Sequence, residues 1–263
     1  MCKNGGRGRG FGGKARLNGR KEELFMKKEE LFERIKGQVI VSCQAVAGEP
    51  LYVEEKSIMY LMARAAKQAG APAIRTSSIR DVVAIREETG LPVIGLIKIQ
   101  YEGFESYITP TMKEVDQLAA AGAEVIALDC THRKRGDGKD VREFITQVRE
   151  KYPQAILMAD ISTYEEGITA WELGMDLVGT TMSGYTAYSP RLEGPDYELV
   201  KKLSATLDIP VIGEGRIHSP EQAVAVLEAG AFAVVVGGAI TRPLEIAGRF
   251  IKAVSGRNGE QGS

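Results

Sequence analysis

The 263-residue sequence predicts a single-domain α/β fold of the (β/α)8 class, the TIM barrel. The main support is a segment, found four times, in which a helix ends at a glycine and a strand begins directly after it. The four glycines are Gly70, Gly122, Gly174 and Gly230. A further strand, led by a proline, falls inside each interval. The unit of two strands and two helices thus occurs about four times, which gives the eight strands of a barrel.

The eight predicted strands are mostly continuous apolar runs, which is typical of strands covered on both faces. They span residues 38–44, 72–76, 92–98, 125–130, 156–161, 177–181, 210–214 and 233–238. Amphipathic helices separate them, and Thr163-x-x-Glu166 and Ser219-x-x-Gln222 are predicted capping boxes at two helix starts. A doubly wound open sheet is the alternative fold, although it does not require so regular a fourfold repeat.

The barrel domain is expected over residues 26–255, with a disordered C-terminal tail at 256–263. Residues 1–25 are expected to be a disordered Gly/Arg-rich extension, because positions 1–20 hold six Lys/Arg, seven Gly and no acidic residue. Gly8 to Ala15 nearly matches a P-loop, but Ala15 stands where Ser or Thr is required and no strand precedes the motif. The true start is left open between Met1 and Met26.

The composition is ordinary for a globular protein, with 44% hydrophobic residues and a net charge of −1. No apolar run approaches the roughly 20 residues that span a bilayer, and the N-terminus lacks a secretory signal. These features predict a cytoplasmic protein with no membrane partner, and no nucleic-acid partner is expected despite the basic extension. Cys2, Cys43 and Cys130 are odd in number and widely spaced, which favours reduced thiols.

Two apolar runs read almost alike and end in opposite charges. Leu91-Pro-Val-Ile-Gly-Leu-Ile-Lys98 and Ile209-Pro-Val-Ile-Gly-Glu214 belong to the third and seventh predicted strands. Counted from the shared proline, Lys98 and Glu214 have the same parity, so both charges point to the same face if the two strands run in equivalent register. The active end of such a barrel is formed by the C-terminal strand ends, where the two charges would face each other. A buried acid and amine are costly to build and suited to moving protons.

Other polar groups also end predicted strands, and an ion pair that fills the barrel mouth is the structural alternative for any one of them. These groups are Gln44, Arg75, Asp129, Asp160 and Thr180. The basic loop 131–139 either forms part of a lid or adds positive potential for an anionic substrate, and a merely solvated loop is the structural alternative. His132 and His218, the only histidines, do not fit a His/Asp metal cluster, so no catalytic metal is predicted.

The loops after the seventh and eighth predicted strands are suited to phosphate binding. Gly215 and Arg216 precede one helix start, and Gly237 and Gly238 precede another that begins after Arg242. Glycines let a phosphate approach the backbone amides, while a helix N-terminus and an arginine favour its charge. A close-packed strand-to-helix turn is the structural alternative.

Six strand-end segments together form a recognisable set. They are Val41-Ser-Cys-Gln44-Ala45, Ala73-Ile-Arg75, Ile94-Gly-Leu-Ile-Lys98, Met158-Ala-Asp160-Ile-Ser162, Ile212-Gly-Glu214-Gly215 and Gly237-Gly-Ala-Ile-Thr-Arg242-Pro243. This set resembles the N-acetylmannosamine-6-phosphate 2-epimerase family over roughly residues 26–255. The resemblance implies interconversion of N-acetylmannosamine 6-phosphate and N-acetylglucosamine 6-phosphate, without a cofactor, in amino-sugar and sialic acid breakdown.

The resemblance also implies roles for individual side chains. Lys98 is expected to be the acid/base group at C2 of the open-chain sugar, with its pKa lowered by burial and nearby cations. Glu214 is either the acid/base group on the opposite face or a group that orients Lys98, so one-base and two-base mechanisms both stay open. The remaining expected substrate contacts are Gln44, Arg75 and Asp160 around the sugar, and Gly215, Arg216, Gly237, Gly238 and Arg242 around the phosphate.

Three other readings of the sequence stay open. A Schiff-base aldolase or a ring-closing synthase also uses a phosphate-binding barrel, and an aldolase needs a strand-borne lysine such as Lys98. A metal-dependent pentose-phosphate epimerase is disfavoured because this sequence lacks the histidine ligands such an enzyme needs. A non-catalytic phosphosugar-binding protein is disfavoured because it would not need both Lys98 and Glu214.

A homo-oligomer, with a dimer favoured, is expected, but the apolar stripe from Leu244 to Phe250 fits ordinary barrel packing as well. How the sugar ring opens is not encoded in any motif.

Overall fold

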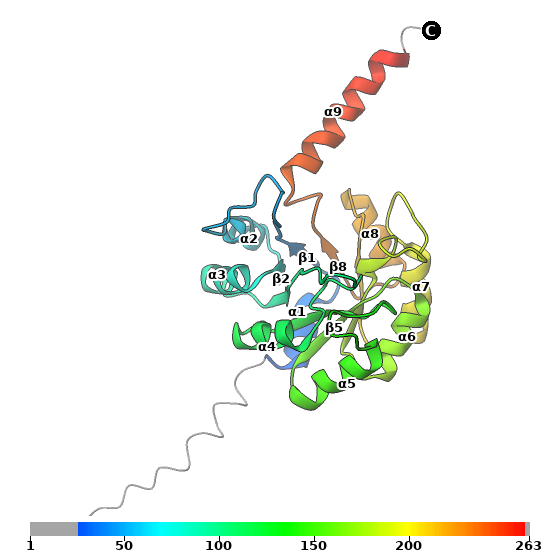
Figure 1. The fold of residues 1–263 in the computed structure, drawn as a ribbon. Coiled ribbons are helices and arrows are strands. Elements are labelled where there is room, and N and C mark those ends of the chain that lie inside the picture. The colour runs from blue at the N-terminus through cyan, green and yellow to red at the C-terminus, as the bar shows by residue number, and fades with distance from the viewer. Residues whose placement is uncertain (1–25, 261–263) are drawn as a thin grey trace, which may run out of the picture.

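The computed structural model describes residues 26–260 and contains a closed barrel of eight parallel strands, which confirms the predicted fold class (Figure 1). Neighbouring strands pair in sequence order, and β8 returns to β1 with Ile40 opposite Val235. The strands are β1 (Val39–Ser42), β2 (Ile74–Ser77), β3 (Val93–Leu96), β4 (Val125–Asp129), β5 (Ile156–Asp160), β6 (Leu177–Gly179), β7 (Val211–Glu214) and β8 (Ala233–Val236).

A helix follows every strand, and one further helix precedes β1. The helices are α1 (Lys28–Ile35), α2 (Met59–Gln68), α3 (Ile79–Thr89), α4 (Met112–Ala120), α5 (Val141–Lys151), α6 (Tyr164–Glu172), α7 (Tyr197–Thr206), α8 (Pro220–Glu228) and α9 (Pro243–Glu260), with a short 3-10 turn η1 (Thr180–Met182) after β6. The predicted capping box at Thr163 and Glu166 is confirmed. At the start of α8 only half of the box forms, because the Gln222 side chain accepts from His218 N instead of Ser219 N.

The strands are shorter at their C-terminal ends than the apolar runs predict. Residues 43–44, 97–98 and 237–238 were expected in strands but lie beyond the ladder, where they enter the loops of the barrel mouth. At the other end of the chain, α9 continues to Glu260 and so extends into the segment predicted as a C-terminal tail. The predicted extension 1–25 and residues 261–263 lie outside the described residues.

Helix α1, which the repeat pattern does not predict, closes the N-terminal end of the barrel. Leu31 and Ile35 are fully buried in a cluster with side chains from the starts of several strands, including Ile40. The rings of Phe32 and Phe232 meet edge to face with centroids 5.9 Å apart. The end that α1 leaves open is the C-terminal mouth, which is where barrel chemistry takes place.

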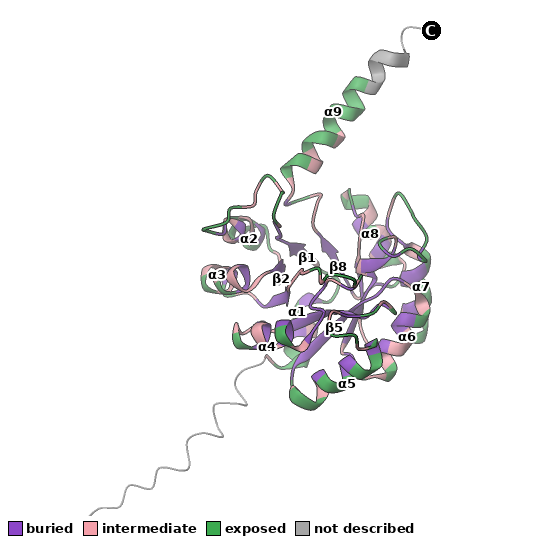
Figure 2. Cartoon of the chain, viewed as in Figure 1, coloured by how far each residue is buried: buried purple, intermediate pink, exposed green. Residues whose placement is uncertain are grey.

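The eighth barrel helix, α9, does not cover the barrel. It projects away from the sheet, and its surface is mostly exposed, unlike that of helices α2 to α8 (Figures 1 and 2). Four large apolar side chains are about two-thirds or more exposed: Leu244 (66%), Phe250 (72%), Ile251 (65%) and Val254 (66%). Such a run of exposed apolar residues on one helix is unusual for an isolated domain. Within the described chain, no helix combines the length and hydrophobicity that crossing a bilayer requires.

Glycines in the two similar strand runs explain why those runs share a sequence. A β-carbon on Gly95 of β3 would lie 2.9 Å from the Ala123 β-carbon, and one on Gly213 of β7 would overlap the Val226 side chain. Both positions therefore allow close approach between a strand and the segment packed outside it. Packing therefore accounts for the glycine of the repeated Val-Ile-Gly motif. It does not account for the charged residues Lys98 and Glu214 that follow the motif.

Candidate active site

A cavity of about 240 Å³ opens at the C-terminal mouth of the barrel. The side chains and backbone that line it come from the ends of β1, β2, β3, β7 and β8 and from the loops after β3 and β6. Its predicted lining residues are Gln44, Arg75, Lys98, Glu214, Gly215, Arg216, Gly237, Gly238 and Arg242. Nine of the ten predicted site residues thus share one cavity, and the tenth, Asp160, does not line it.

Lys98 lies two residues past the end of β3, at a place where the chain folds back on itself. An isolated antiparallel bridge joins Lys98 to Ile108, and Ile99 N donates to Tyr107 O at 3.0 Å. The loop after β3 therefore returns across the mouth and holds the lysine backbone in place, while Lys98 N donates to Ser77 Oγ at 3.3 Å. The lysine is half-buried and has no salt bridge to a carboxylate among residues 26–260.

The surroundings of Lys98 favour its neutral form. Burial lowers the pKa of the Lys98 ammonium, and the positive charges of Arg242 and Arg75 lower it further, while Glu214 and Glu49 oppose the change. A lysine with a lowered pKa holds a larger neutral fraction near pH 7, which is the form that accepts a proton.

Arg75 connects two carboxylates beneath the cavity. It is almost fully buried, and its Nη2 donates to Asp160 Oδ2 at 2.6 Å. Its Nε lies 3.3 Å from Glu214 Oε1 without hydrogen-bond geometry. The Thr181 hydroxyl also links the two acids, at 2.5 Å from Asp160 Oδ1 and 3.2 Å from Glu214 Oε2. Asp160 is fully buried by these partners, which explains why it does not line the cavity as expected.

Glu214 is poorly provided with donors for a buried carboxylate. Burial raises the pKa of Glu214 to about 7, the charge of Asp160 raises it too, and Arg75, Thr181 and Lys98 lower it. At neutral pH this carboxyl is therefore poised between its acid and base forms. Together with the lowered pKa of Lys98, this brings the two groups toward a common range, which suits a pair that exchanges protons.

Gln44 lies at the end of β1 with one amide atom unused. Its Nε2 donates to Ser42 Oγ at 2.9 Å, while its buried Oε1 has no hydrogen-bond partner. A buried unpaired amide oxygen is costly, and in a cavity wall it is available to a ligand hydroxyl or amide.

The glycine loops after β7 and β8 form the opposite wall of the cavity, but the two predicted arginines differ in what they do there. Arg216 has a positive φ of 54°. Its Nε donates to Gly194 O at 2.8 Å and its Nη1 donates to Ser183 O, so it ties down the loop after β6. Arg242 is paired with Glu49 (3.0 Å) and with Glu245 (2.9 Å). Neither guanidinium is a free cation in this structure.

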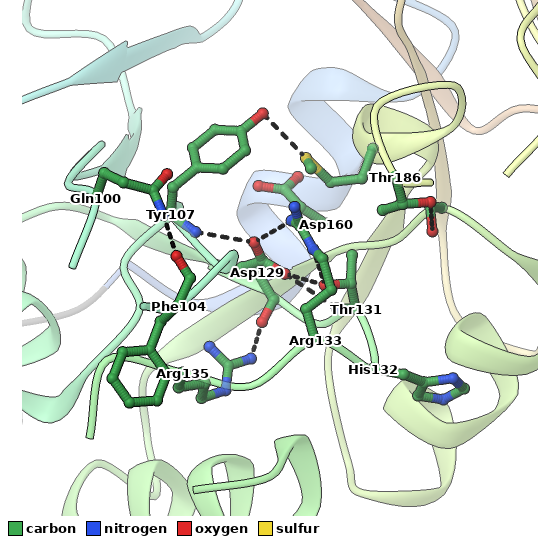
Figure 3. A network of polar contacts seen from close by, with 12 residues as sticks. Gln100, Phe104, Tyr107, Asp129, Thr131, His132, Arg133, Arg135, Asp160 and Thr186 are labelled. Carbon is green, nitrogen blue, oxygen red and sulfur yellow. Dashed lines mark hydrogen bonds and ion pairs between the residues drawn. The ribbon is translucent and has the colours of Figure 1, made fainter. Parts of the chain in front are cut away.

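A second polar network lies on the β4 side of the mouth and meets the cavity wall at Tyr107 (Figure 3). Asp129 is fully buried and pairs with Arg133 at 2.8 Å. Arg135, also fully buried, stacks 4.1 Å from the centre of the Phe144 ring and donates to Asp129 O. The basic loop 131–139 thus turns two of its cations inward, and none of its residues lines the cavity.

Several lining residues escaped the sequence reasoning. They are Tyr107 and Ile108 from the returning loop after β3, Met182 and Tyr185 from the segment after β6, and His218 and Glu245 at the two helix starts. No motif marks them, because each enters the mouth through the path of a loop. The only signal in the sequence that could have indicated a place in the cavity wall was the apolar character of Ile108 and Met182.

Metal binding has no support within residues 26–260, where no cluster of three or more His, Cys, Asp or Glu side chains could hold an ion.

The two cysteines within the described residues are buried. Burial raises the pKa of Cys43 to about 12 and raises that of Cys130 as well, so both thiols are held in their protonated form.

Fold and cavity together define a TIM-barrel protein with a charged cavity at the C-terminal strand ends, the position of the active site in enzymes of this fold. The model of the NanE family, described as "Putative N-acetylmannosamine-6-phosphate epimerase", matches residues 59–256. The chain belongs to this family, which confirms the resemblance seen in the sequence.

Individual relatives support the same family assignment. A protein of Caldanaerobacter subterraneus subsp. tengcongensis with the 2-epimerase name is 54% identical, over 86% of this chain and 94% of its own. The solved structure of N-acetylmannosamine-6-phosphate 2-epimerase from Clostridium perfringens is 49% identical with a TM-score of 0.80, and covers 85% of this chain and 96% of that one. A thiamine phosphate pyrophosphorylase from Pyrococcus furiosus, 20% identical with a TM-score of 0.55 over 82% of this chain and 92% of its own, shares the fold.

Proposed function

We propose that this protein interconverts N-acetylmannosamine 6-phosphate and N-acetylglucosamine 6-phosphate by proton transfer at C2, as an N-acylglucosamine-6-phosphate 2-epimerase. The observation that carries the proposal is the pair of Lys98 and Glu214, which line one cavity from opposite strands of the barrel, β3 and β7. Their pKa values are moved in opposite directions, the amine downward and the carboxyl upward. Family membership supports the choice of substrate.

In the proposed reaction, neutral Lys98 removes the proton on C2 of the open-chain aldehyde. The electrons of the C–H bond form a C1–C2 double bond, and the carbonyl pair moves onto O1, which gives an enolate. Protonated Glu214 then returns a proton to the other face of C2, the enolate electrons reform the carbonyl, and the configuration is inverted. In the reverse direction the roles are exchanged, which a carboxyl with a pKa near 7 permits.

The developing negative charge on O1 needs a donor in the cavity. Arg75 lines the cavity and is held by Asp160, so its position is fixed before the reaction, as electrostatic stabilisation requires. Gln44 has a free buried amide oxygen, which suits it to accept from the N-acetyl N–H or from a hydroxyl. The glycines at 215, 237 and 238, with Arg242, are proposed to hold the phosphate.

The test is an NMR assay of N-acetylmannosamine 6-phosphate with the protein in deuterated water. We expect deuterium at C2 of the gluco product, and Lys98→Ala should abolish both exchange and epimerisation while circular dichroism shows an intact fold. If the product carries deuterium from the first turnover while remaining substrate keeps its proton, both groups transfer protons. Formation of a gluco product that keeps the substrate's own proton would indicate a single base, and a result with neither exchange at C2 nor gluco product would refute the proposal.

The finer expectations about setting belong to the same proposal. The substrate is a phosphorylated N-acetylhexosamine, and the reaction as written needs no cofactor. We place it in amino-sugar and sialic acid breakdown in the cytoplasm, with no membrane or nucleic-acid partner. The names of the bacterial relatives support the amino-sugar role.

We also propose that the protein is a homodimer in which α9 of each copy packs against the barrel of the other. The exposed apolar residues of α9 would be covered, and the flank of each barrel between α8 and α2 has no helix of its own. The neighbouring helices retain exposed Leu61 and Val224, and a mostly apolar hollow of about 90 Å³ lies at the root of α9.

Light scattering after gel filtration tests the dimer. Wild type should elute at twice the mass of the chain, while the double variant Phe250→Glu, Ile251→Glu should shift toward monomer. The control is Val83→Glu on α3, which is also an exposed apolar site but lies on a helix that packs on its own barrel. A monomeric wild type, or a dimer unchanged by the α9 variant, would contradict this arrangement.

A further inference from the structure

The first turn of α9 places a carboxylate in the wall of the cavity. Glu245 lines the cavity, and its Oε1 accepts from Arg242 Nη1 at 2.9 Å. A β-carbon on Gly238 would overlap the Glu245 carboxylate, so this acid lies directly against the glycine loop. No sequence pattern predicted an acidic group at this point, where phosphate was expected.

The partners of the Glu245 carboxylate are those that the proposed phosphate would use. A phosphate held by the glycine loop needs close approach to Gly238, a cation from Arg242 and the positive end of α9. The Glu245 carboxylate has all three. A carboxylate and a phosphate are both favoured by such a site, and repulsion prevents both from occupying it at once.

Glu49, the other acid on Arg242, is placed differently. Its Oε2 accepts from Val46 N at 3.1 Å, so it is fixed to its own loop, and it does not line the main cavity. Arg242 can therefore stay paired with Glu49 while it exchanges Glu245 for another anion. Glu245 is 40% exposed in its side chain and has solvent to move into.

We propose that Glu245 is an internal competitor for the phosphate site and thereby sets the protein's affinity for its phosphosugar. The carboxylate occupies the glycine loop and Arg242 in the free protein and leaves when a phosphate dianion arrives. The inference rests on the phosphate site of the proposed function. A pair this exposed is weak, so displacement by a doubly charged group that Arg242 can bind through two oxygens is favourable.

The experiment compares wild type, Glu245→Gln and a matched control, Glu165→Gln, by calorimetric titration with inorganic phosphate and by steady-state kinetics. Glu165 is an exposed acid in the first turn of α6 and lies outside the cavity. For Glu245→Gln we expect phosphate to bind about 3- to 10-fold more tightly, KM for the phosphosugar to fall by a similar factor, and kcat to stay within about twofold. The control should match wild type in all three.

Arg242→Ala separates failure of this inference from failure of the phosphate site. If Arg242→Ala weakens phosphate binding at least tenfold but Glu245→Gln leaves it unchanged or weaker, the site is correct and Glu245 is not a competitor. If Arg242→Ala has no effect, phosphate binds elsewhere, and both this inference and that part of the proposed function are overturned. An equal gain in affinity in Glu165→Gln would show an effect of net charge alone and would also refute the role of Glu245.

Discussion

Asp129 and Glu214 are both carboxylates that end barrel strands, on β4 and on β7, yet their surroundings differ. The oxygens of Asp129 accept from Thr131 N and Oγ1, from Arg133 Nη2 and from Tyr107 N, at 2.6–3.2 Å. Glu214 has one hydroxyl donor, Thr181, and an arginine at 3.3 Å in poor geometry. The first acid is sealed by the returning loop after β3, and the second faces the cavity.

The difference teaches how a carboxylate at a strand end becomes structural in one place and chemical in another. A carboxylate with all its lone pairs used holds loops together and resists change. A carboxylate that has lost water without gaining donors has its pKa raised and is free to exchange a proton. Substitutions at the two sites should therefore have opposite consequences for activity and stability.

The largest expected effect is on catalysis. Glu214→Gln should lower kcat by about 10²- to 10⁴-fold, because the acid/base group on one face of C2 is removed while a group of equal shape stays. The NMR assay of epimerisation measures this loss. Asp129→Asn, the matched change on β4, should keep kcat within about tenfold. Equal losses in the two variants would show that the comparison does not distinguish a chemical from a structural acid.

The next effect is on stability, where the substitution at Asp129 is expected to matter more than the one at Glu214. Asp129→Asn should lower the free energy of unfolding by about 3 kcal/mol, because the buried Arg133 keeps its charge and loses its counter-ion. Urea denaturation at pH 7 measures the difference. Thr206→Val, a change of similar size at an exposed residue of α7, serves as a control and should cost well under half as much. An Asp129→Asn variant as stable as wild type would contradict the structural role.

A smaller effect is expected on the pH dependence of stability. Glu214 has a pKa of about 7 in the fold against its ordinary value of 4.5, so between these limits the folded protein keeps a proton that the unfolded chain releases. Stability from this group is therefore lost as pH rises from about 4.5 to 7, by about 3 kcal/mol. Urea midpoints at pH 5 and pH 8 should differ less in Glu214→Gln than in wild type. A variant with the wild-type slope would show that Glu214 is not the group that titrates.

Much of the fold followed from the sequence because its signals are local. Continuous apolar strands and helix-ending glycines at regular spacing need no knowledge of distant contacts, and they predicted a closed barrel that the structure confirms. The departure of α9 could not be predicted in this way. Its apolar residues have the spacing of any barrel helix, and only the path of the chain after Thr241 decides which barrel surface the helix can reach.

The candidate site was predictable where position along a strand fixes the direction of a side chain. Lys98 and Glu214 share a parity and line the same cavity. The prediction for Asp160 differed from the structure because the long side chain of Arg75 covers it. Arg216 lines the cavity as predicted, but its backbone acceptors, Ser183 and Gly194, could not be foreseen because they lie in a loop that is distant in sequence. The roles of these residues in the reaction stay predictions.

Helix α1 has a practical consequence for handling the protein. Since α1 closes the end of the barrel opposite the mouth, the described chain begins at Met26 on the side away from the cavity. A dye or a surface linkage attached to an exposed residue of α1, such as Glu33, would leave the entrance unobstructed. The same attachment at the end of α9 would sit on the helix that carries the exposed apolar residues. Immobilised preparations intended to keep working should therefore be tethered through the N-terminal side.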